Sequence, residues 1–191
     1  MAAFDPSTTA LLIMDYQNQI VADYAGGDPE LTLRAASVLD AARAAGIPVI
    51  HVVVHFRPGH PEVANRGVFK GIKAAGAMIG GSEGTEIHPD VAPQSGDILV
   101  TKKRIGAFTG SDLDVVLRSL GSQHLILMGI ATSGVVLSTA RAAADLDFEL
   151  TVVEDCCADQ DEEVHRVLTR KIFARAADIT TAKKLIAKLG H

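Results

Sequence analysis

The chain has 191 residues, and its 18 lysines and arginines against 23 aspartates and glutamates give a formal net charge of −5 at pH 7. Hydrophobic residues make up 48% of it and charged residues 21%, which excludes a largely disordered protein and is typical of a globular one. The cationic residues are scattered among carboxylates, so we expect no nucleic-acid partner. The length is that of one ordinary domain.

Nothing in the sequence indicates a membrane segment or an export signal. No apolar stretch is long enough to cross a bilayer. The early run "TTALLIMDYQ" has no basic region before it, unlike a signal peptide. The two cysteines, Cys156 and Cys157, are neighbours, and a disulfide between adjacent residues requires strained geometry. We therefore expect a cytoplasmic protein with reduced thiols and no membrane partner.

Short apolar runs alternate with helical patterns along the whole chain. We expect strands, in chain order, at residues 9–15, 48–56, 97–103, 124–130 and 148–155 and at the start of 179–190. We expect helices at residues 30–45, 111–121, 134–146 and 161–174, at the end of 179–190, and as one short piece within 68–80. This alternation predicts a three-layer, Rossmann-like α/β fold, in which a sheet of about six mostly parallel strands carries helices on both faces.

Residues 57–95 are the least regular part of the chain and are rich in glycine and proline. A segment of that length inside a compact domain is usually a functional loop or lid. We expect this segment to shape the binding site, although it contains no motif that specifies a ligand.

Three features fall at the carboxyl ends of expected strands, where open parallel sheets bind ligands. Asp15 ends the first strand, Lys102 ends "DILVTK", and the turn "ATSG" (131–134) ends "HLILMGI". Each feature is weak alone. Aspartate commonly ends strands, and Lys102 belongs to a run of cationic residues. Backbone N–H groups that could face an anion are common at the starts of helices.

Together, these features resemble the isochorismatase-like hydrolases, also called cysteine hydrolases. The stretches "ALLIMDYQN", "VTKKRIGAFTGSDLD" and "LILMGIATSGVVLSTARAAADLDFELTVVEDCCADQDEEVH" carry the resemblance, in order, over nearly the whole chain. The resemblance implies one domain of this type over residues 1–191, with a catalytic triad of acid, lysine and cysteine. Asp15 and Lys102 match the acid and the lysine. Val135 stands where the "G-x-x-T-x-x-C-V" turn of the family carries its cysteine.

A valine has no lone pair, so the covalent route of the family's amidases is closed at this position. The family that the chain resembles includes isochorismatases, which lack the cysteine and cleave a vinyl ether by protonation. The resemblance therefore implies that Asp15 is a general acid beside Lys102 and that isochorismate is the leading substrate. We expect the turn to offer oxyanion N–H groups at Ala131 and Val135. We expect substrate contacts at Arg104, Phe108, Thr132 and Ser133.

Other interpretations remain open at this point. The chain could hydrolyse an amide or another C–N bond with water, or with Cys156 or Cys157 recruited as nucleophile. It could also be a non-catalytic protein that binds a small molecule. Ser133 and Ser138 flank Val135, but the sequence places no histidine beside them to act as a base.

Metal and cofactor binding are not expected. His51, His55 and His60 lie close in sequence, and nicotinamidases of the family bind a metal through an aspartate and several histidines. The Asp-x-His pattern is absent here, because Val53 stands two residues before His55. Arg57 and Arg104 follow two strand ends and could bind a substrate carboxylate. The resemblance also implies a homodimer or homotetramer.

Overall fold

The computed structural model describes residues 4–25 and 28–190. Six strands form one sheet: β1 (Thr9–Met14), β2 (Val49–Val54), β3 (Ile98–Lys102), β4 (His124–Ile130), β5 (Glu149–Ala158) and β6 (Asp178–Thr180). The α-helices are α1 (Asn18–Tyr24), α2 (Leu31–Ala44), α3 (Lys70–Ala75), α4 (Leu113–Ser119), α5 (Leu137–Asp145), α6 (Glu162–Val167) and α7 (Ala182–Leu189). Shorter 3-10 or π-helical turns occupy Glu83–Thr85, Pro89–Val91, Thr132–Val136, Leu168–Ile172 and Phe173–Arg175.

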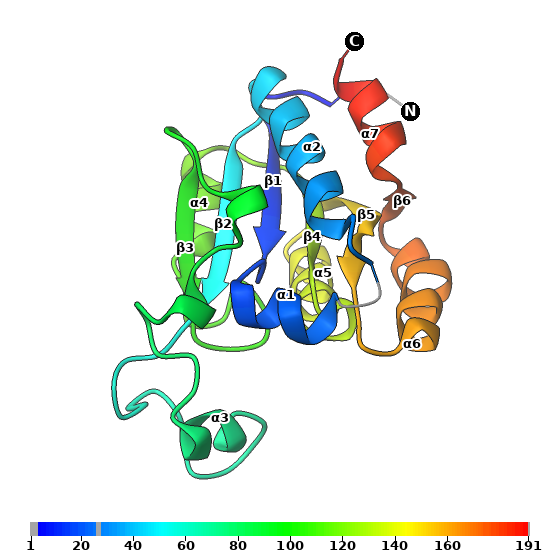
Figure 1. Cartoon of the computed structure of the whole chain (residues 1–191). Helices are drawn as coiled ribbons and strands as arrows, with labels where there is room; N and C mark the ends of the chain where they lie inside the picture. The colour runs from blue at the N-terminus through cyan, green and yellow to red at the C-terminus, as the bar shows by residue number, and fades with distance from the viewer. Residues whose placement is uncertain (1–3, 26–27, 191) are drawn as a thin grey trace.

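The sheet is entirely parallel, with the strand order β3-β2-β1-β4-β5-β6. Helices α2 and α7 lie on one face and α4 and α5 on the other (Figure 1). Strands β1 and β2 are buried along their whole length, since helices cover both faces of a parallel sheet. This arrangement confirms the expected α/β fold, and all six expected strands are present.

Three elements differ from the sequence expectation. Helix α1 was not expected; it has seven residues, none of them fully buried, although Ile20, Val21 and Tyr24 pack against the core. Strand β5 continues past residue 155 to Ala158, and its pairing with β4 shifts register between Leu127 and Gly129. The expected helix 161–174 is one α-helical piece followed by π and 3-10 turns.

The order of the strands reverses between β1 and β4, which makes the crevice at their carboxyl ends the switch point of the sheet. These two strands approach closely at their ends, where Met14 pairs with Gly129. A Cβ atom at position 129 would lie 3.0 Å from the Met14 carbonyl oxygen, so glycine permits this approach. Asp15 and the turn after β4 therefore emerge side by side.

The long connection from β2 to β3 reaches out past the carboxyl ends of the strands and carries α3 away from the sheet (Figure 1). It has a small apolar cluster of its own, separate from the main core. Val54, Phe56 and Val63 are buried there, and Phe69, Ile72 and Met78 pack against them. Part of the irregular segment expected at 57–95 thus extends beyond one end of the sheet and packs on a small apolar cluster of its own.

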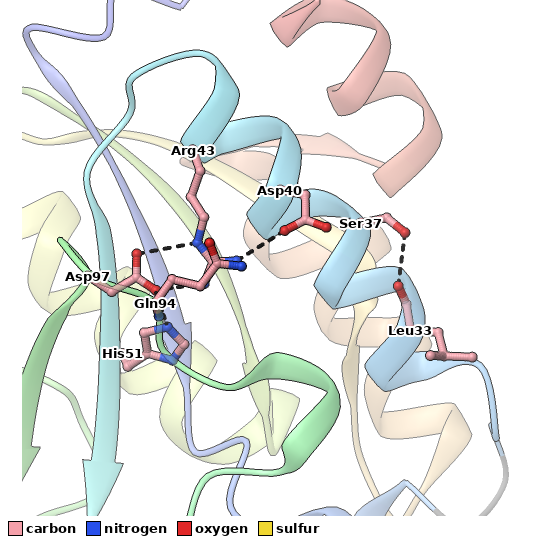
Figure 2. Close-up of polar contacts among 7 residues, drawn as sticks. All are labelled: Leu33, Ser37, Asp40, Arg43, His51, Gln94 and Asp97. Atoms are coloured by element: carbon pink, nitrogen blue, oxygen red, sulfur yellow. Dashed lines mark hydrogen bonds and ion pairs between the residues drawn. The ribbon is translucent and has the colours of Figure 1, made fainter.

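The amino-terminal half of β2 carries a buried polar cluster centred on Asp97, which we call the Asp97 cluster (Figure 2). Asp97 accepts hydrogen bonds from Arg43 Nη2 at 2.6 Å and from the Gln94 N–H at 2.9 Å, and its Oδ2 lies 3.2 Å from His51 Nε2. Burial alone would raise the pKa of Asp97, yet these hydrogen bonds and the Arg43 charge lower it. The cluster joins α2, β2 and the start of β3.

We expect Asp97→Ala to destabilise the fold by about 3 kcal/mol, because it leaves His51 and Arg43 without their buried partner. Asp40→Ala is the matched control. Asp40 also pairs with Arg43, at 3.1 Å, but its side chain is 71% exposed against 5% for Asp97. The control should cost less than about 1 kcal/mol. Urea unfolding of both variants tests this, and equal losses would contradict a structural role for the Asp97 cluster.

Candidate active site

The first two site residues come from strands that are not neighbours in the sheet. Asp15 directly follows β1 and adopts a left-handed conformation, with φ of 59°, which aspartate tolerates better than most residues. Its N–H donates to the Val52 carbonyl at 2.8 Å. Lys102 ends β3 and reaches across the end of β2, so that its Nζ lies 2.9 Å from Asp15 Oδ2.

Both groups of this ion pair are almost completely removed from solvent, with 5% exposure for Asp15 and 2% for Lys102. Burial raises the pKa of Asp15 to about 6, and the neighbouring Lys102 charge only partly offsets this effect. Desolvation therefore outweighs the attraction to Lys102. Asp15 thus takes up and releases a proton around pH 6, well above the usual range of an aspartate.

The two oxygens of Asp15 have different environments. Oδ2 faces Lys102, whereas Oδ1 is buried and has no hydrogen-bond partner among the described residues. A buried carboxyl oxygen without a partner is costly, and such groups cluster where a ligand or a proton completes them. Oδ1 is therefore the oxygen at which Asp15 can exchange a proton with a bound molecule.

Sequence reasoning missed Gln17, which fixes the geometry beside this pair. Its fully buried side chain accepts from the Val54 N–H at 2.8 Å and donates to the carbonyls of Val54 at 2.9 Å and Thr85 at 2.8 Å. It thereby ties the segment after β1 to the end of β2 and to the long connection. The sole signal in the sequence is its place in "ALLIMDYQN", two residues after Asp15.

The third site element is the turn Thr132–Val136, which follows β4 and leads into α5. The peptide bond between Ile130 and Ala131 is cis. Val135 is 2% exposed, and its side chain has no sulfur or oxygen atom that could attack a substrate.

Side chains from α6 and from the segment just after β5 hold this turn from one side. The Ser133 N–H donates to Asp159 Oδ2 at 2.7 Å, and Thr132 Oγ1 lies 2.8 Å from His165 Nδ1. The Thr132 hydroxyl and the Ser133 N–H are thus engaged with other protein groups, whereas the side chain of Ser133 is exposed. Asp159 and His165 were not singled out as site residues from the sequence. Asp161 caps α6, through the N–H groups of Glu163 and Val164.

Arg104 and Phe108 come together in a cavity of about 460 Å³ formed by the loop after β3, the long connection and α5. Asp15, Lys102 and Val135 are not among its lining residues. The wall is nevertheless continuous with the site, because Lys102 Nζ donates to the Arg104 carbonyl at 2.9 Å. Ile105 also lies against the turn, 3.9 Å from where a Cβ of Gly134 would be.

The remaining candidates lie apart from this arrangement. His60 Nε2 bonds the Ala77 carbonyl at 2.7 Å, His55 lies beside Thr101, and His51 belongs to the Asp97 cluster. Within residues 4–25 and 28–190, no three His, Cys, Asp or Glu side chains are grouped so as to hold a metal ion. Helices in those same ranges are all too short or too polar to cross a membrane.

Comparisons with known proteins agree with the fold. The Isochorismatase domain family matches residues 9–184. Ureidoacrylate amidohydrolase RutB from Caulobacter vibrioides is 35% identical over 173 residues, which cover 79% of this chain and 77% of RutB. Maleamate amidohydrolase from Pseudomonas putida is 28% identical over 189 residues, which cover 95% of this chain and 87% of that protein.

An isochorismatase family protein from Burkholderia thailandensis has a similar solved structure. The two structures superpose with a TM-score of 0.84 and 30% sequence identity over the full length of both chains. The fold and these relatives define an α/β enzyme of the hydrolase class. The chain belongs to the isochorismatase family.

Proposed function

We propose that this enzyme hydrolyses a small carboxyvinyl ether, of which isochorismate is the example, by acid catalysis from Asp15 and without a covalent intermediate. The main support for this proposal is the buried carboxyl of Asp15, whose pKa is about 6. Its Oδ2 faces Lys102, and its Oδ1 has no partner among the described residues. A general acid works best when its pKa lies near the working pH.

The absence of a usable thiol supports the non-covalent route. The two cysteines lie on β5, exposed by 0% and 5%, and Cys157 Sγ donates weakly to the Val153 carbonyl at 3.4 Å. Burial raises the pKa of Cys157 to about 12 and also raises that of Cys156. Neither forms the thiolate that nucleophilic catalysis needs at neutral pH.

In this mechanism, Asp15 Oδ1–H gives its proton to the methylene carbon of the vinyl ether. The ether oxygen stabilises the resulting cation, and the Asp15 carboxylate that remains is stabilised by Lys102. Water then adds to the cationic carbon and gives one proton back to Asp15. The hemiketal that forms then breaks the bond between its central carbon and the ether oxygen, and its hydroxyl proton passes to that oxygen. The products are pyruvate and an alcohol that keeps the ether oxygen.

A second candidate is hydrolysis of an amide by an activated water molecule, and the named relatives favour it, since both are amidohydrolases. Here Asp15 would act first as a base. The same carboxyl serves either role, but in opposite protonation states at the start of the reaction.

The pH dependence of kcat/KM separates the two functions. If protonated Asp15 is the starting acid, kcat/KM for the vinyl ether falls as pH rises through about 6. If ionised Asp15 is the starting base, kcat/KM for an amide rises through the same pH. A profile that is flat between pH 5 and pH 8 on every substrate that turns over would contradict both assignments.

We expect both thiols to resist iodoacetamide in the native protein at pH 8 and to react after denaturation in urea. Burial raises their pKa values and also blocks approach of the reagent. Intact-protein mass spectrometry measures the number of adducts in each state. Rapid addition to the native protein would mean that one thiol is exposed and reactive. Hydrolysis of an amide with that cysteine as the nucleophile would then be favoured.

A further inference from the structure

The cavity beside the site is lined by charged side chains that have no part in the proposed reaction. Arg66, from the long connection, and Arg104, from the loop after β3, both line it, and no aspartate or glutamate does. The side chains of Phe69 and Phe108 supply apolar walls. An exclusively cationic lining is unusual in a chain whose net charge is −5.

Neither guanidinium is neutralised by a carboxylate of the described residues. Arg104 donates to two backbone carbonyls, those of Lys103 at 2.6 Å and Glu62 at 3.1 Å. Arg66 makes no hydrogen bond or ion pair with the described part of the chain. In contrast, Arg57 in the same connection is paired with Glu62 at 2.6 Å.

The acidic side chains at this end of the sheet gather around a different cavity. That cavity, of about 810 Å³ between α1 and α6, is lined by Asp23, Asp28, Glu154, Asp155, Asp159, Glu162 and Glu163. Two arginines also line it, but Arg34 is paired with Asp28 and Arg166 with Glu163, so carboxylates remain in excess. An anion would be repelled there and attracted to the cavity of Arg66 and Arg104, so the two cavities differ in the sign of the charge that they accept.

We propose that Arg66 is a specificity-determining residue, which together with Arg104 binds the carboxylates of a flat organic acid whose body lies against Phe69 and Phe108. Planar guanidinium groups match carboxylates in bidentate geometry, and aromatic side chains pack against flat unsaturated bodies. The volume of about 460 Å³ falls in the range of small-ligand pockets.

This inference rests on the proposed function only for the location of the reacting bond. The cavity wall at Arg104 bonds to Lys102, and Ile105 packs near the turn that carries Val135. An acid held by the two arginines would therefore place its remaining atoms next to the Asp15–Lys102 pair. The substrate class that follows is a small acid with two carboxylates.

Calorimetric binding of three flat probes to the Asp15→Asn variant tests the proposal without any turnover. Benzamide, benzoate and isophthalate carry no, one and two carboxylates on the same ring. We expect affinity to rise in that order, and Arg66→Gln to weaken isophthalate binding about tenfold while leaving benzamide binding unchanged. Arg57→Gln is the matched control, since it removes the same charge from an existing ion pair.

Several results would overturn the proposal. These are equal binding of the three probes, no binding of any of them, equal effects of Arg66→Gln and Arg57→Gln, or competition by inorganic phosphate as strong as that by isophthalate. Because binding is measured with Asp15 already replaced, a failure here is distinct from a failure of the Asp15 mechanism. The reverse outcome, binding without catalysis in the parent protein, would contradict the proposed function alone.

Discussion

Asp15→Asn is expected to lower kcat/KM by about 10²- to 10⁴-fold, the usual contribution of a general acid or base. The amide has nearly the same shape and can still accept a hydrogen bond from Lys102, but it cannot donate the reacting proton. Steady-state turnover of the parent and the variant, with circular dichroism to confirm the fold, measures the effect.

Asp23→Asn is the matched control for this substitution. Asp23 lies on α1 at the same end of the sheet but is exposed, and it contacts Gln19 rather than Lys102. Its replacement should leave kcat/KM within about twofold of the parent, since a change at an exposed side chain remote from the reacting groups has little effect. Full activity of the Asp15→Asn variant would exclude Asp15 as the acid and would leave the mechanism without a proton donor.

Lys102→Met is expected to destabilise the protein by about 3–5 kcal/mol at pH 8, since it leaves the Asp15 carboxylate buried without its counter-ion. The loss should be smaller at pH 5. Burial already raises the pKa of Asp15 to about 6 from 3.8, and removal of Lys102 raises it further. Below the folded-state pKa the carboxyl is protonated and needs no partner.

The sign follows from linkage. A group whose pKa is higher in the folded than in the unfolded state contributes stability below its unfolded pKa and loses it as pH rises through the folded value. For Asp15 in the parent, this contribution to stability is lost between about pH 4 and pH 6, and in Lys102→Met the loss extends to higher pH. Urea unfolding at pH 5 and pH 8 tests the difference.

Lys73→Met is a suitable control for this prediction, because Lys73 Nζ donates to the Val63 carbonyl at 2.9 Å and pairs with no carboxylate of the described residues. Its stability loss should not depend on pH in this range. The double variant Asp15→Asn/Lys102→Met should recover part of the stability at pH 8, as coupled partners do. An equal loss at both pH values in Lys102→Met would contradict the buried ion pair.

The sequence was sufficient to predict the strands and the two charged residues of the site. Continuous apolar runs such as "HLILMGI" have one stable place in an α/β fold, the middle of a parallel sheet. Asp15 and Lys102 directly follow or end such runs, so their convergence at the carboxyl edge follows from topology.

Other parts of the site depend on contacts between distant segments. Gln17 meets the long connection, and Asp159 meets the turn before α5, through backbone groups that no local pattern identifies. The unpartnered Oδ1 of Asp15 and the raised pKa result from three-dimensional burial. Arg66 lies in a segment without periodicity, and its place in the cavity became visible only in the folded chain.

The central claim is that Asp15, and no thiol, carries out the reaction. The most direct measurement is pyruvate release from isochorismate by two variants, Cys156→Ala/Cys157→Ala and Asp15→Asn, beside the parent. The variant without cysteines should retain the parent's rate, and Asp15→Asn should release almost no pyruvate. Loss of activity in the folded cysteine-free variant, or its retention in Asp15→Asn, would contradict the account.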